Sequence, residues 1–206
     1  PVLLFNGKEI LFKGANIHEH NELTGHYVTD DLYYKDIELL KQNNFNGLRF
    51  SHYPQSRKFY DLCDQYGIYV VSECNIESHG MGYDSDKTLA NKPEWLIPHM
   101  DRTKNMYKRS RNHASTTLFS LGNEAGNGCN FYDTYNYLKD HEKINQNRPI
   151  QYNIAGWDWN TDTYFPMYPT LDWLEEIGKS GSDRPIIQCE YSHAMGNSNG
   201  NFKRMW

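Results

Sequence analysis

The sequence predicts an α/β fold in which strands and helices alternate to build a parallel (β/α)8 TIM barrel. Short apolar runs of four to six residues, typical of strands that are buried on both faces, alternate with helical patterns along the chain. Polar residues follow nearly every run, as they do at the carboxyl-terminal rim of a barrel. A doubly wound sheet also fits the alternation, but its functional residues gather at one switch point, so the barrel is favoured.

Seven strands are expected, at residues 10–15, 45–50, 68–73, 116–121, 149–152, 164–167 and 185–189. A barrel of this class has eight strands, and stopping at seven leaves two unpaired edges. We therefore expect the barrel to be truncated before its eighth strand, which should follow Trp206. Residues 1–206 then form one domain, cut from a longer multidomain chain.

Five helices are expected between these strands. Thr29 is a candidate N-cap for a helix over 32–42, with Asp30 and Asp31 as early acids. Ser56 is the candidate N-cap of the next helix, and Gly67 ends it at the position where a left-handed residue is favoured. Three more helical patterns cover 98–111, 131–141 and 171–179.

Composition excludes several classes of function. The net charge is −5 and the pI is near 6.0, so nothing suggests a nucleic-acid partner, and no apolar run is long enough to span a membrane. The aromatic content of 15% suits either sugar stacking or an aromatic core. Four cysteines without C-x-x-C spacing are interpreted as buried thiols. The sequence shows no signal peptide, so the compartment stays open between cytoplasm and periplasm.

Two glutamates each end an apolar run. Glu124 follows the run at 116–121, and Glu190 follows the run at 185–189. Two carboxylates at one rim are what glycoside hydrolysis requires, because one protonates the leaving oxygen while the other attacks or stabilises the anomeric carbon. Asn123, beside Glu124, is suited to hold the 2-hydroxyl of a sugar.

Other polar residues follow the first three strands. His18 and His20 lie on one side of an extended segment, although alone they are more often surface or hydrogen-bonded residues. His52 is presented by the turn that Pro54 closes. Arg49 lies within a predicted barrel strand, where a charge needs a partner, so we expect it to anchor a carboxylate.

Glu77 and His79 follow the third strand and form either a plain hydrogen-bonded pair or half of a divalent-metal site. A third carboxylate and water would complete a site for Mg²⁺ or Mn²⁺. A metallohydrolase that uses His18, His20, Glu77 and His79 is an alternative if those side chains converge. It would leave the two glutamate motifs unexplained.

Six segments together resemble glycoside hydrolase family 2, and within it the β-galactosidases. They are Asn-x-His-Glu-His at 16–20, Ser-His-Tyr-Pro at 51–54, Tyr-Val-Val-x-Glu-x-Asn-Ile-Glu-x-His-Gly-Met at 69–81, Ser-Leu-Gly-Asn-Glu at 120–124, Pro-Met-Tyr at 166–168 and Cys-Glu-Tyr-x-His-Ala-Met-Gly-Asn at 189–197. They occur in the family's order and cover essentially the whole chain.

The resemblance implies a retaining glycosidase that removes terminal β-D-galactosyl residues from a β-galactoside, with Glu124 as acid/base and Glu190 as nucleophile. It implies an active-site Mg²⁺ held by Glu77, His79 and Glu124, and a galactose subsite lined by His18, His52, Asn123, Tyr168 and His193. It also implies flanking domains in the same full-length chain, and the chain could form a homo-oligomer. The alternatives are a β-glucuronidase or β-mannosidase of the same family, or a non-catalytic sugar-binding barrel.

Overall fold

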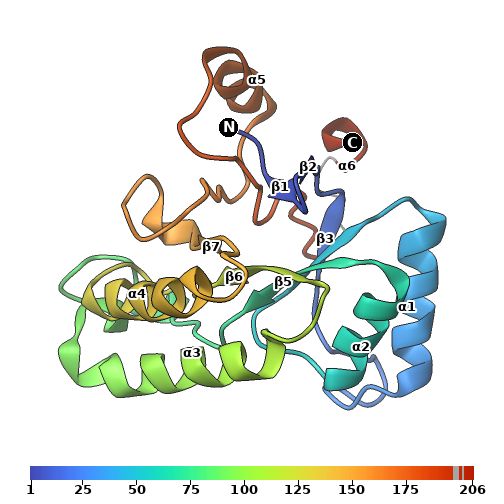
Figure 1. Ribbon diagram of the computed structural model, residues 1–206, viewed down its shortest axis with the longest axis horizontal. Coiled ribbons are helices and arrows are strands. Elements are labelled where there is room, and N and C mark those ends of the chain that lie inside the picture. Colours follow the sequence, from blue (N-terminus) through green and yellow to red (C-terminus); the bar gives the residue numbers. More distant parts are fainter. Residues whose placement is uncertain (197–199, 201) are drawn as a thin grey trace.

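A five-stranded parallel sheet forms the centre of the molecule in the computed structural model, which describes residues 1–196, 200 and 202–206 (Figure 1). Its strands are hydrogen-bonded in sequence order, so all five carboxyl ends meet at one rim. They are β3 (Gly14–Ile17), β4 (Gly47–Phe50), β5 (Tyr69–Glu73), β6 (Thr116–Ser120) and β7 (Ile150–Gln151).

The central strands are buried along nearly their whole length, as the apolar runs predict. Every residue of β4 and β6 is buried, and β5 is buried from Val70 onward. Two apolar clusters lie between the sheet and the helices that pack on it. One packs α1 and α2 against β4 around Phe50 and Phe59, and the other packs α3 and α4 against β6 around Phe119 and Phe131. Removing this apolar area from water stabilises the fold.

All five expected helices are present. α1 and α2 lie beside one another at one end of the sheet, α3 and α4 at the other, and α5 lies apart from both pairs (Figure 1). Their bounds are α1 (Asp30–Gln42), α2 (Arg57–Tyr66), α3 (Leu96–Ser110), α4 (Cys129–Lys143) and α5 (Leu171–Ser180), with α6 (Phe202–Met205) and 3₁₀ helices at His79–Met81, Leu89–Asn91, Pro93–Trp95 and Asn153–Ala155.

The predicted helix ends are largely confirmed. The Ser56 hydroxyl accepts a hydrogen bond from the Lys58 backbone N–H, and Gly67 ends α2 with φ of 68°. Thr29 holds the N-cap position of α1, but its side chain makes no capping hydrogen bond. The two acids that follow it, Asp30 and Asp31, begin the helix as expected.

The prediction for the first strand was wrong in its bounds. β3 begins at Gly14, whereas the run at 10–15 was expected to pair from residue 10. Residues 10–13 belong to no strand and connect β3 to a hairpin of β1 (Leu4–Phe5) and β2 (Lys8–Glu9). The Asn46 side chain then takes the place of a strand neighbour, because it accepts from the Lys13 N–H (2.7 Å) and donates to the Leu11 carbonyl (2.9 Å).

The sixth and seventh predicted strands, at 164–167 and 185–189, are extended segments rather than ladder strands. They run parallel to each other through isolated bridges at Tyr164–Ile186 and Met167–Glu190. Pro166 and Pro185 lie within them, and proline has no N–H to donate to a ladder. Both prolines still accept hydrogen bonds through their carbonyls, so the segments remain side by side and end at the same rim.

No helix among the described residues is long and apolar enough to cross a membrane. A cavity of about 630 Å³ lies between β3 and the 185–189 segment, and Leu11, Phe12 and Ile187 contribute to its lining. Asn197, the last residue of the motif that starts at Cys189, lies outside the described residues.

Candidate active site

Glu190 lies at the end of its segment within a set of charged and phenolic groups. Arg49 Nη1 donates to Glu190 Oε1 at 3.1 Å, and the Tyr168 hydroxyl donates to Glu190 Oε2. His52 Nε2 lies 3.9 Å from Glu190 Oε1. Burial, followed by the hydrogen bond to Glu190, raises the pKa of Tyr168 above its ordinary value, so the phenol keeps its proton. Glu190 is therefore held at both oxygens.

Glu124 follows β6 after a sharp change of backbone direction. Its φ is 43°, a left-handed value that is uncommon outside glycine and that gathers at functional sites. Glu124 Oε2 bonds with His79 Nδ1 at 2.8 Å, and that hydrogen bond raises the pKa of His79. Tyr168 also has a left-handed backbone, with φ of 49°.

One guanidinium connects the two glutamate motifs. Arg49 Nη1 bonds to Glu190, while Nη2 donates at 2.8 Å to Oδ1 of Asn123, the neighbour of Glu124. The pKa of Tyr83 is also affected by both glutamates. Burial raises this pKa most, the charge of Glu124 comes next and Glu190 adds a smaller contribution, and together they raise it to about 12. The structure thus collects both glutamate motifs at one rim.

The remaining predicted side chains join the same cluster. The His18 ring lies 5.3 Å from the His52 ring, and burial followed by the nearby His52 lowers the pKa of His18. The His193 ring lies 5.1 Å from the Tyr168 ring. Four different segments of the chain supply these rings, which is why no single motif could show that they meet.

Glu77, His79 and Glu124 form a group that fits a divalent cation. Each offers one ligand atom, and these atoms lie within 4.8 Å of one another. Two carboxylate oxygens and an imidazole nitrogen, with access to water, are a donor set that such cations accept. Glu77 also accepts from the Asn123 amide and from the His79 backbone N–H, so the set is held from several sides.

The alternative metallohydrolase site does not form. The His20 ring lies against the His26 ring, 5.8 Å away. Among the described residues, the groups with metal-ligand geometry contain neither His18 nor His20. The convergence of His18 and His20 with Glu77 and His79, which this alternative requires, is therefore not seen among the described residues.

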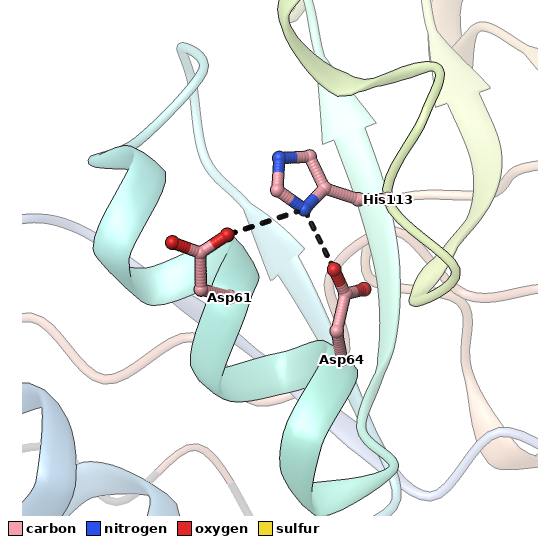
Figure 2. A group of neighbouring side chains, drawn as sticks. All are labelled: Asp61, Asp64 and His113. Carbon is pink, nitrogen blue, oxygen red and sulfur yellow. Dashed lines mark hydrogen bonds and ion pairs between the residues drawn. The ribbon is translucent and has the colours of Figure 1, made fainter.

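Figure 2 shows a second group of metal-ligand residues, formed by Asp61 and Asp64 of α2 with His113. His113 precedes β6, so the group lies at the amino-terminal end of the strands, opposite the rim that carries the glutamates. His113 Nδ1 lies 2.7 Å from Asp64 Oδ2, and the other oxygen of Asp64 accepts from the Ser115 N–H at 2.7 Å. These bonds fasten α2 to the turn that leads into β6.

Arg49 and Glu73 form a buried ion pair beneath the rim. Their side chains are 4% and 0% exposed, and Arg49 Nε donates to Glu73 Oε2 at 2.7 Å. The expectation that Arg49 anchors a carboxylate is confirmed, and it anchors two. Burial opposes ionisation of Glu73, but the charge of Arg49 and the hydrogen bonds from His52 and Ser120 outweigh burial and lower its pKa.

Sequence reasoning gave no role to Glu73 or Tyr83. A signal existed for Glu73, because it ends the apolar run at 68–73 as Glu124 and Glu190 end theirs. Tyr83 follows a short 3₁₀ helix in a segment without periodic pattern, and nothing in the sequence indicates that its hydroxyl lies 3.1 Å from His79 Nδ1.

Comparison with known proteins identifies the family of this chain and solved structures with a similar fold. The family described as "Glycosyl hydrolases family 2, TIM barrel domain" matches residues 1–206. A curated β-galactosidase of Alteromonas mediterranea is 42% identical over 217 residues, which cover 99% of this chain and 20% of that protein. The chain thus spans about one fifth of this relative's length.

Solved structures of two bacterial β-glucuronidases share the fold. That of Ruminococcus gnavus superposes with a TM-score of 0.77 at 21% identity, over 94% of this chain and 38% of the other. That of Faecalibacterium prausnitzii gives a TM-score of 0.73 at 26% identity, over 96% of this chain and 38% of the other.

Proposed function

The chain belongs to the TIM barrel domain family of the family 2 glycosyl hydrolases, and on that premise we propose that it is the catalytic barrel of a retaining β-galactosidase. Glu190 attacks the anomeric carbon while Glu124 protonates the departing oxygen, which leaves a glycosyl–enzyme ester. Glu124, now a base, takes a proton from water as that water releases the sugar.

The observation that supports this pairing most strongly is the reach of Arg49 to both glutamate motifs. Its contact with Glu190 holds one carboxylate oxygen in place beside the reacting carbon. A retaining mechanism requires the carboxyl groups of Glu124 and Glu190 to lie about 5–5.5 Å apart. A separation near the larger value of inverting enzymes would contradict the proposal.

His18, His52, Asn123, Tyr168 and His193 are proposed to bind the galactosyl ring. His52 and Tyr168 contact the Glu190 side of the site, and Asn123 stands beside Glu124. The Asn123 amide donates one hydrogen to Glu77, which leaves its second hydrogen for a sugar hydroxyl. A hydrogen bond to the 2-hydroxyl strengthens as the transition state develops.

Glu77, His79 and Glu124 are proposed to hold Mg²⁺, whose positive charge would stabilise negative charge that develops beside Glu124. Dialysis of the intact protein against a chelator should lower kcat, and added Mg²⁺ should restore it. Glu77→Gln should raise the Mg²⁺ concentration needed for half-activation by about tenfold or more. If neither the chelator nor added Mg²⁺ changes the activity, the proposed metal site plays no part in the reaction.

The comparisons support β-galactosides as the proposed substrates. The relative named a β-galactosidase is 42% identical, whereas the β-glucuronidase structures are 26% and 21% identical. A β-glucuronidase is therefore the second candidate. A β-mannosidase, or a barrel that binds sugar without cleaving it, has no specific observation in its favour.

A panel of nitrophenyl glycosides tests the proposal on the intact protein. The β-galactoside should be cleaved at least about 100-fold faster than the glucuronide and the mannoside. Glu190→Gln should lower kcat by about a thousandfold or more, because the amide is no nucleophile. Glu175→Gln, on an exposed face of α5, is the matched control and should keep full activity. Preference for the glucuronide would support the second candidate, and cleavage of no glycoside would support the sugar-binding alternative.

A further inference from the structure

Glu73 is a fully buried carboxylate that sits below the proposed reacting groups. Its side chain is 0% exposed and accepts four hydrogen bonds, two at each oxygen. Oε1 accepts from Arg49 Nη2 (3.0 Å) and His52 Nδ1 (2.7 Å), and Oε2 accepts from Arg49 Nε (2.7 Å) and Ser120 Oγ (2.7 Å). A carboxylate has about four lone-pair sites, so all of them are in use.

Two of those partners face the proposed nucleophile. The Arg49 fork is fixed on Glu73 through Nε and Nη2, which aims Nη1 at Glu190 and the second hydrogen of Nη2 at Asn123. His52 gives its Nδ1 proton to Glu73, so Nε2 is the ring nitrogen turned toward Glu190. This tautomer follows from the hydrogen-bond network.

One positive charge is shared between two carboxylates across the same contacts. The Glu73 charge compensates the Arg49 charge, so that Arg49 is shared between two carboxylates. Without the charge on Glu73, the guanidinium would pair with Glu190 alone. A carboxylate that is fully engaged by a buried cation is a weaker nucleophile, and an Arg49 free to turn would also release Asn123.

We propose that Glu73 is a positioning residue of the glycosidase reaction, which holds Arg49 and His52 in register with Glu190 and Asn123. This inference rests on the proposed function. The inference goes beyond the proposed function because it gives a role to a buried residue that is neither a sugar ligand nor a reacting group. A merely structural role predicts loss of folded protein, whereas a positioning role predicts folded protein with a slow chemical step.

Glu73→Gln in the intact protein separates the two roles. The amide nitrogen would face donors on Arg49, His52 or Ser120, so at least one of the four bonds is lost. Active sites are counted by titration with an activated 2-deoxy-2-fluoro-β-galactoside. We expect kcat per titrated site to fall by about 100-fold, with KM changed by less than about threefold.

Glu142→Gln is the matched control. Glu142 forms the same kind of buried clamp, with Arg148 Nη2 at 2.7 Å and side chains 1% and 6% exposed. This pair joins the last turn of α4 to the chain just before β7, and the further side-chain partners of Glu142 are Tyr107 and Asn145, which are not residues of the site. This variant should lose stability and keep kcat per titrated site. Should Glu73→Gln fail to fold, Glu73→Asp keeps the charge but withdraws the carboxylate, and kcat per site should then fall by about tenfold or more.

The failures of the two claims are distinguishable. If the wild-type protein cleaves the β-galactoside but both Glu73 variants keep kcat per titrated site within about threefold, the positioning role is rejected and the proposed function stands. If the wild-type protein cleaves none of the nitrophenyl glycosides, the proposed function fails first. A Glu142→Gln variant as slow per site as Glu73→Gln would also reject the positioning role, since any buried clamp would then have the same effect.

Discussion

Gly122 sets the direction of the two side chains that follow it, Asn123 and Glu124. Its φ is 153°, and a Cβ at this position would lie 2.6 Å from the Ile76 carbonyl oxygen. The same oxygen accepts a hydrogen bond from the Asn123 N–H at 2.9 Å, so the backbone at Gly122 and Asn123 lies directly against the backbone of Ile76. The left-handed Glu124 follows directly. A glycine is needed here for space as well as for conformation.

Gly122→Ala should therefore lower both stability and activity. The new methyl group meets backbone, which cannot move aside easily, so we expect a loss of about 2 kcal/mol and at least about a tenfold fall in kcat. Denaturant unfolding and steady-state kinetics measure the two effects.

Gly67→Ala is the control for this substitution. Gly67 has φ of 68° and nothing within 4 Å of an added Cβ, so only the conformational penalty of about 1 kcal/mol applies, with kcat unchanged. Equal kcat in both alanine variants would show that the approach to Ile76 does not position Glu124.

The contact of α4 with β7 depends on a buried ion pair. Glu142, in the last turn of α4, accepts from Arg148 Nε, Nη2 and the Arg148 backbone N–H, just before β7 begins. The Tyr107 hydroxyl of α3 donates to the same carboxylate at 2.9 Å. Burial opposes its ionisation, but the bonds from Arg148 prevail and lower the pKa of Glu142.

Breaking this pair should destabilise the protein. Glu142→Gln leaves Arg148 without its counter-charge, and we expect a loss of about 3 kcal/mol in the free energy of unfolding at pH 7. Glu175→Gln removes an exposed pair with Lys179 and should change stability by less than about 0.5 kcal/mol.

The Glu142 effect should depend on pH in one direction. Because its folded pKa lies below the ordinary value of 4.5, the contribution is complete above that pH and disappears as the pH falls through the folded pKa. The difference between wild type and Glu142→Gln should therefore narrow below about pH 4.5. A difference that stays constant or widens with acid would contradict the ionised pair.

Strand–helix alternation predicted the parallel sheet and its five helices, and the polar residues that follow the strands favoured the barrel and the rim on which Glu124 and Glu190 lie. Local pattern carries this information because buried strands must be apolar and helices must be amphipathic. The strands predicted at 164–167 and 185–189 form only isolated bridges to each other, because Pro166 and Pro185 have no N–H to donate to a continuous ladder. Glu73 was missed as a site residue because its partners, Arg49, His52 and Ser120, come from other strands and turns.

The proposed site exists only in the assembled barrel. Residues from His18 to His193 reach one rim because consecutive parallel strands end there. A cavity of about 630 Å³ lies between β3 and the 185–189 segment, away from the rim that carries these residues. Within the described residues, both proposed catalytic glutamates and the proposed metal group are present together.

The proposed mechanism requires Glu190 and Glu124 to act on the same sugar in one pocket. An activated 2-deoxy-2-fluoro-β-galactoside tests this most directly, because its fluorine slows release of the glycosyl–enzyme ester and lets it accumulate. Digestion and mass spectrometry should place the label on Glu190, with turnover of the ordinary galactoside giving the β-anomer first. A label on another carboxylate, or an α-anomer as first product, would contradict the mechanism.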